Sequence, residues 1–370
     1  MNLLVTGGAG YIGSVVAARL VKAGHHVVVY DDLSRGHRRA VPTEAEFILG
    51  EISNRPGLEE ALRKRGIEAV LHFAGLIEAG ESMRAPEAYF RNNTTGSLVL
   101  LEAMLAAGVR KLVFSSTAAL YGAPERQPIQ ESDPLCPTNA YGESKLLVER
   151  ILAWFHRIHG LRYASLRYFN AAGADGGLGE SHQPESHLIP IALGVALGDR
   201  PSLSVFGNDY PTPDGTCVRD YVHVADLARA HLLALDALST CDRLIFNLGS
   251  GRGFSVQEVL ESVRSVTGHA IPAIQAPRRP GDPPVLIASS EKIRRELGWR
   301  ADHADLETIV RSAWEWHRRF PHGYDRAKAM LAPRSGSDQS AANAHGYSIG
   351  ASGGAQLADN GRHVKLGGAL

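Results

Sequence analysis

The sequence predicts an α/β protein built on a Rossmann-type, doubly wound parallel sheet, followed by a smaller mixed α/β C-terminal domain. The chain opens with an apolar run, residues 2–6, that ends in glycines. Apolar runs and helical patterns then alternate as far as residue 169, and parallel strands buried on both faces have this continuous apolar character. From residue 173 onward glycine, proline and histidine become frequent, which indicates a second kind of domain.

The composition is that of an ordinary globular protein and excludes several classes of function. The 370 residues are 44% hydrophobic and 21% charged, and their formal net charge is zero. We expect no nucleic acid and no membrane as a partner, because these would favour a basic surface or a long apolar segment. The three cysteines are scattered and odd in number, and the first strand leaves no room for a signal peptide, so we expect a cytoplasmic location.

The first elements form a complete βαβ unit. Residues 2–6 are expected to be a buried strand, and residues 14–23 a helix that stops at Gly24. Residues 26–30 are a second strand, which Asp31 closes. A unit of this length predicts a right-handed crossover between two parallel strands.

The same alternation supplies the rest of the sheet. Further strands are expected at residues 46–49, 69–74, 111–116 and 162–169, and helices at residues 57–64 and 86–107. Beyond the change in composition we expect a strand at residues 203–206, a helix at 224–238, and a strand at 244–248 that returns to the main sheet.

A helix that carries Tyr141 and Lys145 follows a proline-rich loop. Thr138 is the expected N-cap, and the apolar positions that follow it recur with helical spacing. Two residues four apart project from one face of a helix. A lysine ammonium beside a phenol favours the phenolate, so the pair can form a general base. Considered alone, Tyr-x-x-x-Lys is also a frequent accident on amphipathic helices.

The chain divides into two domains and a tail. We expect a Rossmann domain from residues 1–173 plus 221–252, and a substrate domain from residues 174–220 plus 253–324. Residues 325–370 are rich in Gly, Ala and Ser with few large apolar residues, which predicts a disordered tail that the chemistry does not need.

Three glycines follow the first strand where a dinucleotide fingerprint is expected. Gly7, Gly10 and Gly13 allow a tight turn and close backbone approach, and the helix N-terminus offers amide donors to a pyrophosphate. Asp31 lies where a carboxylate accepts the ribose hydroxyls, which favours NAD over NADP. Arg35 and Arg38 lie just beyond it, and the Asp31-Asp32 pair also fits a turn or a helix cap.

A series of motifs along the chain now resembles a known family, the extended short-chain dehydrogenase/reductases. The matching motifs lie in residues 6–13, 72–75, 115–122, 141–145, 167–170, 206–210, 215–224 and 278–282. Within this family the motifs are most similar to those of enzymes that invert carbon 4 of a UDP-hexose, and the resemblance extends from Met1 to about Tyr324.

The resemblance implies NAD as cofactor, a UDP-hexose as substrate, and a role for each site residue. Tyr141 would be the general base for the sugar 4-hydroxyl, Thr117 would orient that hydroxyl, and Lys145 would hold the nicotinamide ribose and lower the pKa of Tyr141 together with the nicotinamide cation. The implied cofactor contacts are Gly7, Gly10, Tyr11, Ile12, Gly13, Asp31, Asp32, Glu51, Ile52, Phe73, Ala74, Gly75, Asn92, Ser115, Tyr141, Lys145 and Phe169. The implied substrate contacts are Thr117, Tyr141, Asn170, His187, Leu188, Phe206, Arg219, Arg279 and Asp282.

The residues after Thr117 bear on the kind of reaction. Related dehydratases carry an Asp-Glu pair there and related decarboxylases a nearby glutamate, whereas this chain has Ala118 and Ala119, which cannot move a proton. The resemblance then implies oxidation at carbon 4, rotation of the keto sugar, and reduction from the other face, with UDP-glucose and UDP-galactose as the expected pair.

Three positions depart from the family's usual pattern. Ile77 stands where some members have a lysine near the nicotinamide ribose, and Glu51 replaces the commoner aspartate beside adenine. Leu286 occupies the position that limits the size of the hexose, and leucine is intermediate there.

Several alternatives stay open. The substrate could instead be a UDP-N-acetylhexosamine, a UDP-pentose or a UDP-uronate, and the same fold also occurs in NAD-binding regulatory proteins that do no chemistry. No metal is expected, because the sixteen histidines show no familiar metal-ligand spacing. A homodimer is expected through the helices at residues 86–107 and 138–156, as in the family.

Overall fold

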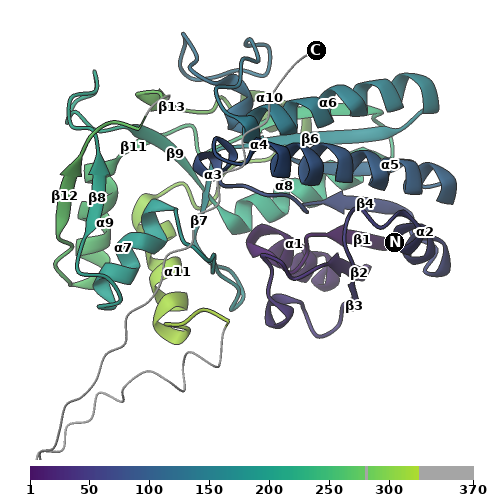
Figure 1. The fold of residues 1–370 in the computed structure, drawn as a ribbon, viewed down its shortest axis with the longest axis horizontal. Coiled ribbons are helices and arrows are strands. Elements are labelled where there is room, and N and C mark those ends of the chain that lie inside the picture. The colour runs from purple at the N-terminus through teal and green to yellow at the C-terminus, as the bar shows by residue number, and fades with distance from the viewer. Residues whose placement is uncertain (280–281, 325–370) are drawn as a thin grey trace, which may run out of the picture. The chain divides into compact units, whose positions relative to one another are not determined.

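The computed structural model describes residues 1–279 and 282–324, and its centre is a seven-stranded parallel sheet (Figure 1). The strand order is β10-β6-β5-β4-β1-β2-β3. The strands are β1 Asn2–Thr6, β2 His26–Asp31, β3 Glu46–Leu49, β4 Ala69–His72, β5 Lys111–Thr117, β6 Arg162–Tyr168 and β10 Arg243–Leu248. The order reverses between β1 and β4, which is the doubly wound arrangement that the sequence predicts.

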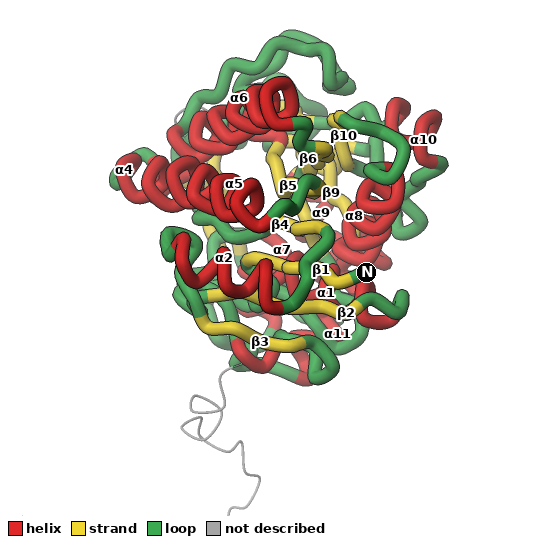
Figure 2. Tube along the Cα trace, turned by 90° about the vertical axis from the view of Figure 1, so that its right-hand side faces the viewer, coloured by secondary structure: helices red, strands yellow, loops and turns green. Residues whose placement is uncertain are grey.

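Helices cover both faces of this sheet (Figure 2). The side chains of β1 alternate: Leu3 and Val5 join one apolar core and Leu4 joins the other. The first core is closed by α1 Tyr11–Lys22 and α8 Val224–Ala237, and the second by α2 Arg55–Lys64, α5 Gly96–Ala107 and α6 Ala140–His159. All three β1 side chains are fully buried, which explains the unbroken apolar run in the sequence.

The remaining elements form a smaller mixed α/β region. One group of strands is β7 Asn170–Ala172, β9 Val218–His223, β11 Gly253–Ser255 and β13 Val285–Leu286, with both parallel and antiparallel pairs. A second, parallel pair is β8 Leu203–Phe206 with β12 Ala273–Ala276. A third apolar core joins helices α7 Leu188–Ala196, α9 Val256–Thr267 and α11 Leu306–Arg319. The predicted division into two domains stays a prediction, and the predicted tail lies outside the described residues.

The predicted helix at residues 86–107 is continuous but not uniform. Its pieces are α4 Pro86–Tyr89, a π-helical stretch Phe90–Thr95, and α5. The wide turn holds Asn93, whose amide nitrogen donates to Leu76 O at 3.0 Å and to Ser144 Oγ at 3.0 Å. The irregularity therefore lets a helix side chain bridge the loop after β4 and helix α6.

Other local differences concern where helices begin. The predicted N-cap Thr138 is wrong: Asn139 caps α6, because its Oδ1 accepts from Gly142 N at 2.8 Å. Helix α1 begins at Tyr11 rather than at Ser14. One short helix that the sequence pattern does not reveal is α3 Ala79–Ser82, whereas the charged residues 291–296 lie on the short helix α10 Glu291–Leu297, as their pattern of a solvated helix face predicts. Among the described helices none combines the length and the apolar character that a membrane span needs.

A buried ion pair fixes α6 on the sheet. Arg167 on β6 contacts Glu149 on α6 through two hydrogen bonds, Nη2 to Oε2 at 2.6 Å and Nε to Oε1 at 3.0 Å. Ser116 Oγ on β5 donates to the same carboxylate at 2.7 Å. The forked guanidinium thereby sets the position of α6 against two strands at once.

A second buried carboxylate, that of Asp220 on β9, joins three segments. It accepts from Ser250 N at 2.7 Å, Ser250 Oγ at 2.7 Å, Gly251 N at 3.0 Å and Ala288 N at 3.1 Å. Burial raises the pKa of Asp220 to about 6, although these four donors act in the opposite direction. The carboxylate therefore binds the loop after β10 and the segment after β13 to the middle of β9.

We expect Asp220→Asn to lower the free energy of unfolding by about 2–4 kcal/mol. The amide NH2 of asparagine would point at backbone N–H groups that now donate to the carboxylate, and these buried N–H groups would lose their acceptor. Urea denaturation followed by circular dichroism at pH 7.5 measures this change. The matched control is Asp236→Asn at an exposed position of α8, which is expected to change stability by less than about 0.5 kcal/mol. Equal denaturation midpoints for the two variants would contradict the role of the Asp220 carboxylate as a stabilising buried acceptor.

Candidate active site

A cavity lies at the carboxyl ends of the central strands, where the strand order reverses. Its volume is about 440 Å³. Residues that follow four of the central strands line it: Gly7 after β1, Phe73 after β4, Thr117 at the end of β5 and Phe169 after β6. In open α/β sheets this crevice is where ligands bind.

The glycine-rich turn is packed too closely for a side chain at Gly7 or at Gly13. Gly7 has a φ of 71°, and a Cβ there would lie 2.4 Å from Ala74 N. A Cβ on Gly13 would lie 2.3 Å from Gly7 O. Helix α1 begins directly after this turn and has no acidic residue in its first turn. The turn and the helix N-terminus therefore fit the pyrophosphate of a dinucleotide.

Asp31 and Asp32 have different surroundings. Asp31 is 7% exposed, and its two oxygens accept from Ala9 N at 3.0 Å and Leu33 N at 2.8 Å. Burial raises its pKa. Each oxygen keeps a further lone pair for a hydroxyl donor. Asp32 is exposed and accepts from Ser34 N and Ser34 Oγ. It therefore stabilises a turn, which is the alternative role that the sequence allows for the Asp31-Asp32 pair.

Tyr141, Thr117 and Lys145 meet on the same wall of the cavity. Burial raises the pKa of the Tyr141 phenol, and the nearby Thr117 hydroxyl lowers it. Lys145 is 3% exposed, its Nζ donates to Ser115 O at 3.1 Å, and burial lowers its pKa to about 8. The pKa of the phenol is thus raised rather than lowered. Its expected depression by Lys145 and a nicotinamide cation stays a prediction.

Backbone and side-chain hydrogen bonds hold the start of α6 in place. Ser144 Oγ donates to Tyr141 O at 2.7 Å and accepts from Asn93 Nδ2 at 3.0 Å. Thr94 Oγ1 donates to Ser144 O at 3.0 Å. The predicted cofactor contact Asn92 lines the cavity and donates to Asn93 Oδ1 at 3.0 Å. The π-helical stretch therefore supports the helix turn that carries Tyr141 and Lys145.

The cavity brings together nearly all predicted cofactor contacts. The residues that line it are Gly7, Gly10, Tyr11, Ile12, Gly13, Asp31, Asp32, Ile52, Phe73, Ala74, Gly75, Asn92, Ser115, Tyr141, Lys145 and Phe169. Glu51 does not line it; its carboxylate accepts from Ser53 Oγ at 3.2 Å instead. Ile77 lines the same cavity, where some relatives of the expected family carry a lysine.

The predicted substrate contacts fall into two groups. Thr117, Tyr141, Asn170, His187, Arg219 and Asp282 line the cavity, and Arg219 Nη2 lies 3.7 Å from Asp282 Oδ1. Leu188, Phe206 and Arg279 do not. Leu188 packs on the third apolar core, and the guanidinium of Arg279 stacks 3.9 Å from the ring centre of Phe206. Their role as direct contacts stays a prediction.

The wall beside Thr117 is apolar. Ala118, Ala119 and Leu286 line the cavity there, and Leu286 packs with Ala118 and Phe169 in a small apolar cluster. None of these side chains can donate or accept a proton. Proton transfer beside Thr117 must therefore come from other side chains of the cavity, such as Tyr141.

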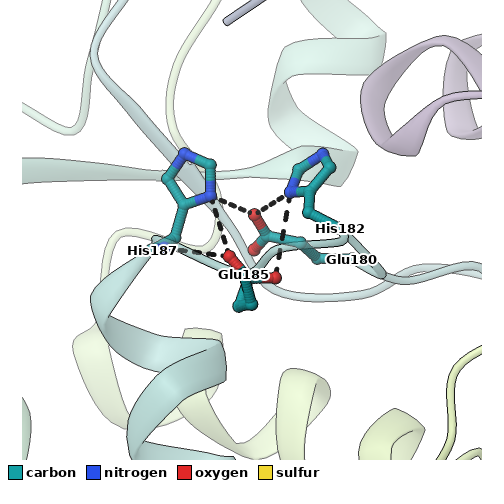
Figure 3. Close-up of side chains that lie close together, drawn as sticks. All are labelled: Glu180, His182, Glu185 and His187. Atoms are coloured by element: carbon teal, nitrogen blue, oxygen red, sulfur yellow. Dashed lines mark hydrogen bonds and ion pairs between the residues drawn. The ribbon is translucent and has the colours of Figure 1, made fainter. Parts of the chain in front are cut away.

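The sequence analysis missed a group of titratable residues in the segment between β7 and α7. Glu180, His182 and His187 line the cavity, and Glu185 lies beside them (Figure 3). The carboxylates raise the pKa of both imidazoles although burial opposes this, and the imidazoles hold the pKa of Glu180 below its usual range. Of these four residues, only His187 is among the predicted substrate contacts. The signal was the spacing Glu-x-His-x-x-Glu-x-His within eight residues.

We expect Lys145→Met to raise the free energy of unfolding by about 1–3 kcal/mol at pH 7.5, because it removes a buried charge at the cost of one hydrogen bond. The lysine pKa falls from 10.5 to about 8 on folding, so the unfolded chain binds more protons between these values. Stability of the unsubstituted protein should therefore rise with pH in this interval, and the difference from the variant should narrow.

Urea denaturation at pH 7.5 and 9.5, with nucleotide removed from both proteins, measures this difference. The control is Lys292→Met, because Lys292 also donates to a carbonyl, Ile245 O at 2.9 Å, but is only half-buried. A Lys145→Met variant that is less stable than the parent, or whose difference is the same at both pH values, would contradict the prediction.

Comparison with known proteins now identifies the family. A sequence model of the NAD dependent epimerase/dehydratase family matches residues 3–249. A UDP-glucose 4-epimerase of Streptomyces lividans is 56% identical over 323 residues, which cover 87% of this chain and 98% of that protein. The structure of UDP-glucose 4-epimerase from Brucella ovis in complex with NAD is similar with a TM-score of 0.83 and 46% identity, over 85% of this chain and 97% of that one.

The Bifidobacterium longum UDP-glucose 4-epimerase in complex with NAD+ and UDP has a TM-score of 0.83 and 37% identity, over 87% of this chain and 100% of that one. Sequence and fold thus agree over nearly the whole length of these proteins. The chain belongs to the NAD dependent epimerase/dehydratase family.

Proposed function

We propose that this chain is an NAD-dependent UDP-glucose 4-epimerase, which interconverts UDP-glucose and UDP-galactose. The observation that carries the proposal is the meeting of Tyr141, Thr117 and Lys145 in one cavity with the glycine-rich turn. The relatives named UDP-glucose 4-epimerase support the choice of reaction, and the structures with NAD and with UDP support the choice of ligands.

The residues of the cavity suggest how the reaction proceeds. Tyr141 takes the proton of the 4-hydroxyl, which Thr117 orients, while a hydride leaves carbon 4. NAD, when bound, supplies the reversible hydride acceptor for this step. Lys145 holds positive charge beside the phenol and orients the ribose. In the second half Tyr141 returns the proton to the 4-oxygen as carbon 4 regains the hydride on its other face, so atoms and electrons balance over the cycle.

The apolar wall supports the required rotation of the keto sugar. Asn170 and Arg219 would hold the UDP part through its phosphates and uracil, whereas Ala118, Ala119 and Leu286 offer the hexose no hydrogen bonds. A hexose that is anchored only through UDP can present either face to the same hydride acceptor. The absence of an acid–base side chain at positions 118 and 119 argues against elimination of water.

A UDP-N-acetylhexosamine is the second candidate substrate. The observation in its favour is Leu286, whose side chain lines the cavity and is smaller than an aromatic ring. Assays with UDP-galactose and with UDP-N-acetylgalactosamine distinguish a site that accepts only the hexose from one that also accepts the N-acetylhexosamine. UDP-pentoses and UDP-uronates are the remaining candidates if neither hexose reacts.

We expect purified protein to convert UDP-galactose to UDP-glucose without added NAD, and Tyr141→Phe to lower kcat about 10²- to 10⁴-fold with little change in KM. The loss follows because phenylalanine keeps the ring but cannot move a proton. Separation of the two nucleotide sugars by liquid chromatography measures the rate.

Tyr163→Phe is the matched control, because Tyr163 lies on β6 in the second apolar core and outside the cavity. It should keep the parent rate. An unchanged rate in Tyr141→Phe would reject the catalytic assignment and leave a non-catalytic NAD-binding protein as the interpretation. No conversion by the parent protein, even with added NAD, would reject UDP-galactose as substrate.

We also infer a homodimer, through α6 and the helical residues 86–107. Helix α6 exposes Trp154 and Ile158, with exposed fractions of 59% and 63%. They lie four residues apart on one face, and exposed apolar side chains that cluster mark an interaction surface.

The three free cysteines are compatible with the cytoplasmic location that the sequence predicts.

We expect sedimentation velocity at micromolar concentration to show a dimer, and Trp154→Glu with Ile158→Glu to shift it toward monomer, because two carboxylates cannot be buried in an apolar interface. Ile274→Glu on β12 is the control, since Ile274 is 60% exposed but lies away from α6. A parent protein that sediments as a monomer would overturn the inference.

A further inference from the structure

The segment between β7 and α7 places four potential metal ligands at one point. Glu180, His182, Glu185 and His187 each offer one atom, and these four atoms lie within 4.8 Å of one another. Figure 3 shows both imidazole rings turned toward the two carboxylates. We propose that these four side chains form a binding site for a divalent transition metal ion, best matched by zinc, in the wall of the cavity.

The distances between the ligand atoms suit a small tetrahedral ion. His187 Nδ1 lies 2.8 Å from Glu180 Oε1 and 3.1 Å from Glu185 Oε1. His182 Nδ1 lies 3.1 Å from Glu180 Oε1 and 3.8 Å from Glu185 Oε2. Ligand atoms at about 2.0–2.1 Å from a tetrahedral zinc ion are about 3.3 Å apart. The quoted separations lie on both sides of this spacing, and because the four ligand atoms spread over as much as 4.8 Å, side-chain shifts on the order of 1 Å would complete the coordination.

His187 Nδ1 lies within hydrogen-bond distance of Glu185 Oε1 at 3.1 Å, whereas the orientation of the His182 ring favours a shared centre over a separate ion pair. Glu180 Oε1 is close to a nitrogen of each ring, yet His182 Nδ1 is buried without an aligned hydrogen-bond partner among residues 1–279 and 282–324. An imidazolium that served only as an ion-pair partner would direct its N–H at a carboxylate oxygen. A lone pair on Nδ1 that points between the carboxylates is the arrangement of a metal ligand.

Burial and charge also fit a divalent ion. The side chain of Glu180 is 5% exposed and those of Glu185 and His182 are 13% and 17% exposed. Two carboxylates with two neutral imidazoles carry a charge of about −2, which one divalent cation neutralises. The mixture of imidazole and carboxylate ligands favours zinc over magnesium or calcium, which prefer oxygen alone.

Neighbouring groups orient the ligands from outside. Ser186 N and His187 N donate to Glu185 Oε1 at 2.8 and 2.9 Å, and the edge of the Tyr11 ring packs against His182 with 6.4 Å between ring centres. His37 Nε2 lies 2.7 Å from Ser181 O, within the same segment. Supporting contacts of this kind fix ligating side chains and raise metal affinity.

The ion would hold in place the irregular segment between β7 and α7. Tyr11 Oη donates to Gly173 O at 2.6 Å at one end of this segment, and His187 precedes α7 at the other. A metal ion bound by the four side chains would restrict the motion of this segment, which forms part of the cavity wall. It would take no part in the proton transfer at Tyr141. The inference thus stands independently of the proposed reaction.

The test is a zinc titration of the full chain, freed of any histidine tag and dialysed against a chelator. We expect about one zinc ion per chain after gel filtration, measured by mass spectrometry of the metal. His182→Asn and Glu185→Gln should each weaken zinc binding at least tenfold. His269→Asn, which changes an exposed histidine outside the group, should leave binding unchanged.

Cobalt provides a measurement that does not depend on any variant. Cobalt(II) bound to the parent protein should show the visible absorption of a tetrahedral complex, and zinc but not magnesium should abolish it. Less than about one tenth of a zinc ion per chain would overturn the proposal. So would zinc binding that is equal in the parent, His182→Asn and Glu185→Gln proteins. Substrate is absent from every measurement, so failure here is distinct from failure of the proposed function.

Discussion

The buried pair of Glu149 and Arg167 is the constraint on which the site depends. Glu149 lies one helical turn after Lys145 on α6, and Arg167 lies on β6, near the end of the strand. Both side chains are almost fully buried, so each charge requires the other and the geometry tolerates little movement. Because Ser116 on β5 joins the same carboxylate, the pair fixes the distance between the helix face that carries Tyr141 and the strand that ends in Thr117.

The same wall of the cavity shows why function works against stability. Lys145 is buried with one hydrogen bond to a carbonyl, and Tyr141 is packed where its neutral form is favoured. A chain selected for stability alone would place an apolar residue at position 145. Hydrogen bonds from Asn139 at the helix start and from Asn93 in the wide turn hold the backbone around these two destabilising side chains in place.

Much of the architecture was accessible from the sequence, because burial leaves a periodic record. The strands of the central sheet and the glycine-rich turn were predicted within a few residues, and their match to the family confirms the resemblance. The N-cap was misplaced because Thr138 and Asn139 have similar capping propensity and only the backbone direction selects one. The Glu180–His187 group was missed because its spacing matches no familiar metal-binding pattern, and the convergence of its side chains depends on how an irregular segment folds back.

The π-helical stretch Phe90–Thr95 gives this chain an unusual sensitivity to length. A residue more or less within it would rotate everything that follows by about 100° around the helix axis. Leu100 and Leu101 would then turn away from the second apolar core, and Asn93 could no longer face Ser144. Insertions and deletions should therefore be far rarer here among related chains than in the neighbouring loops, even where the individual side chains vary.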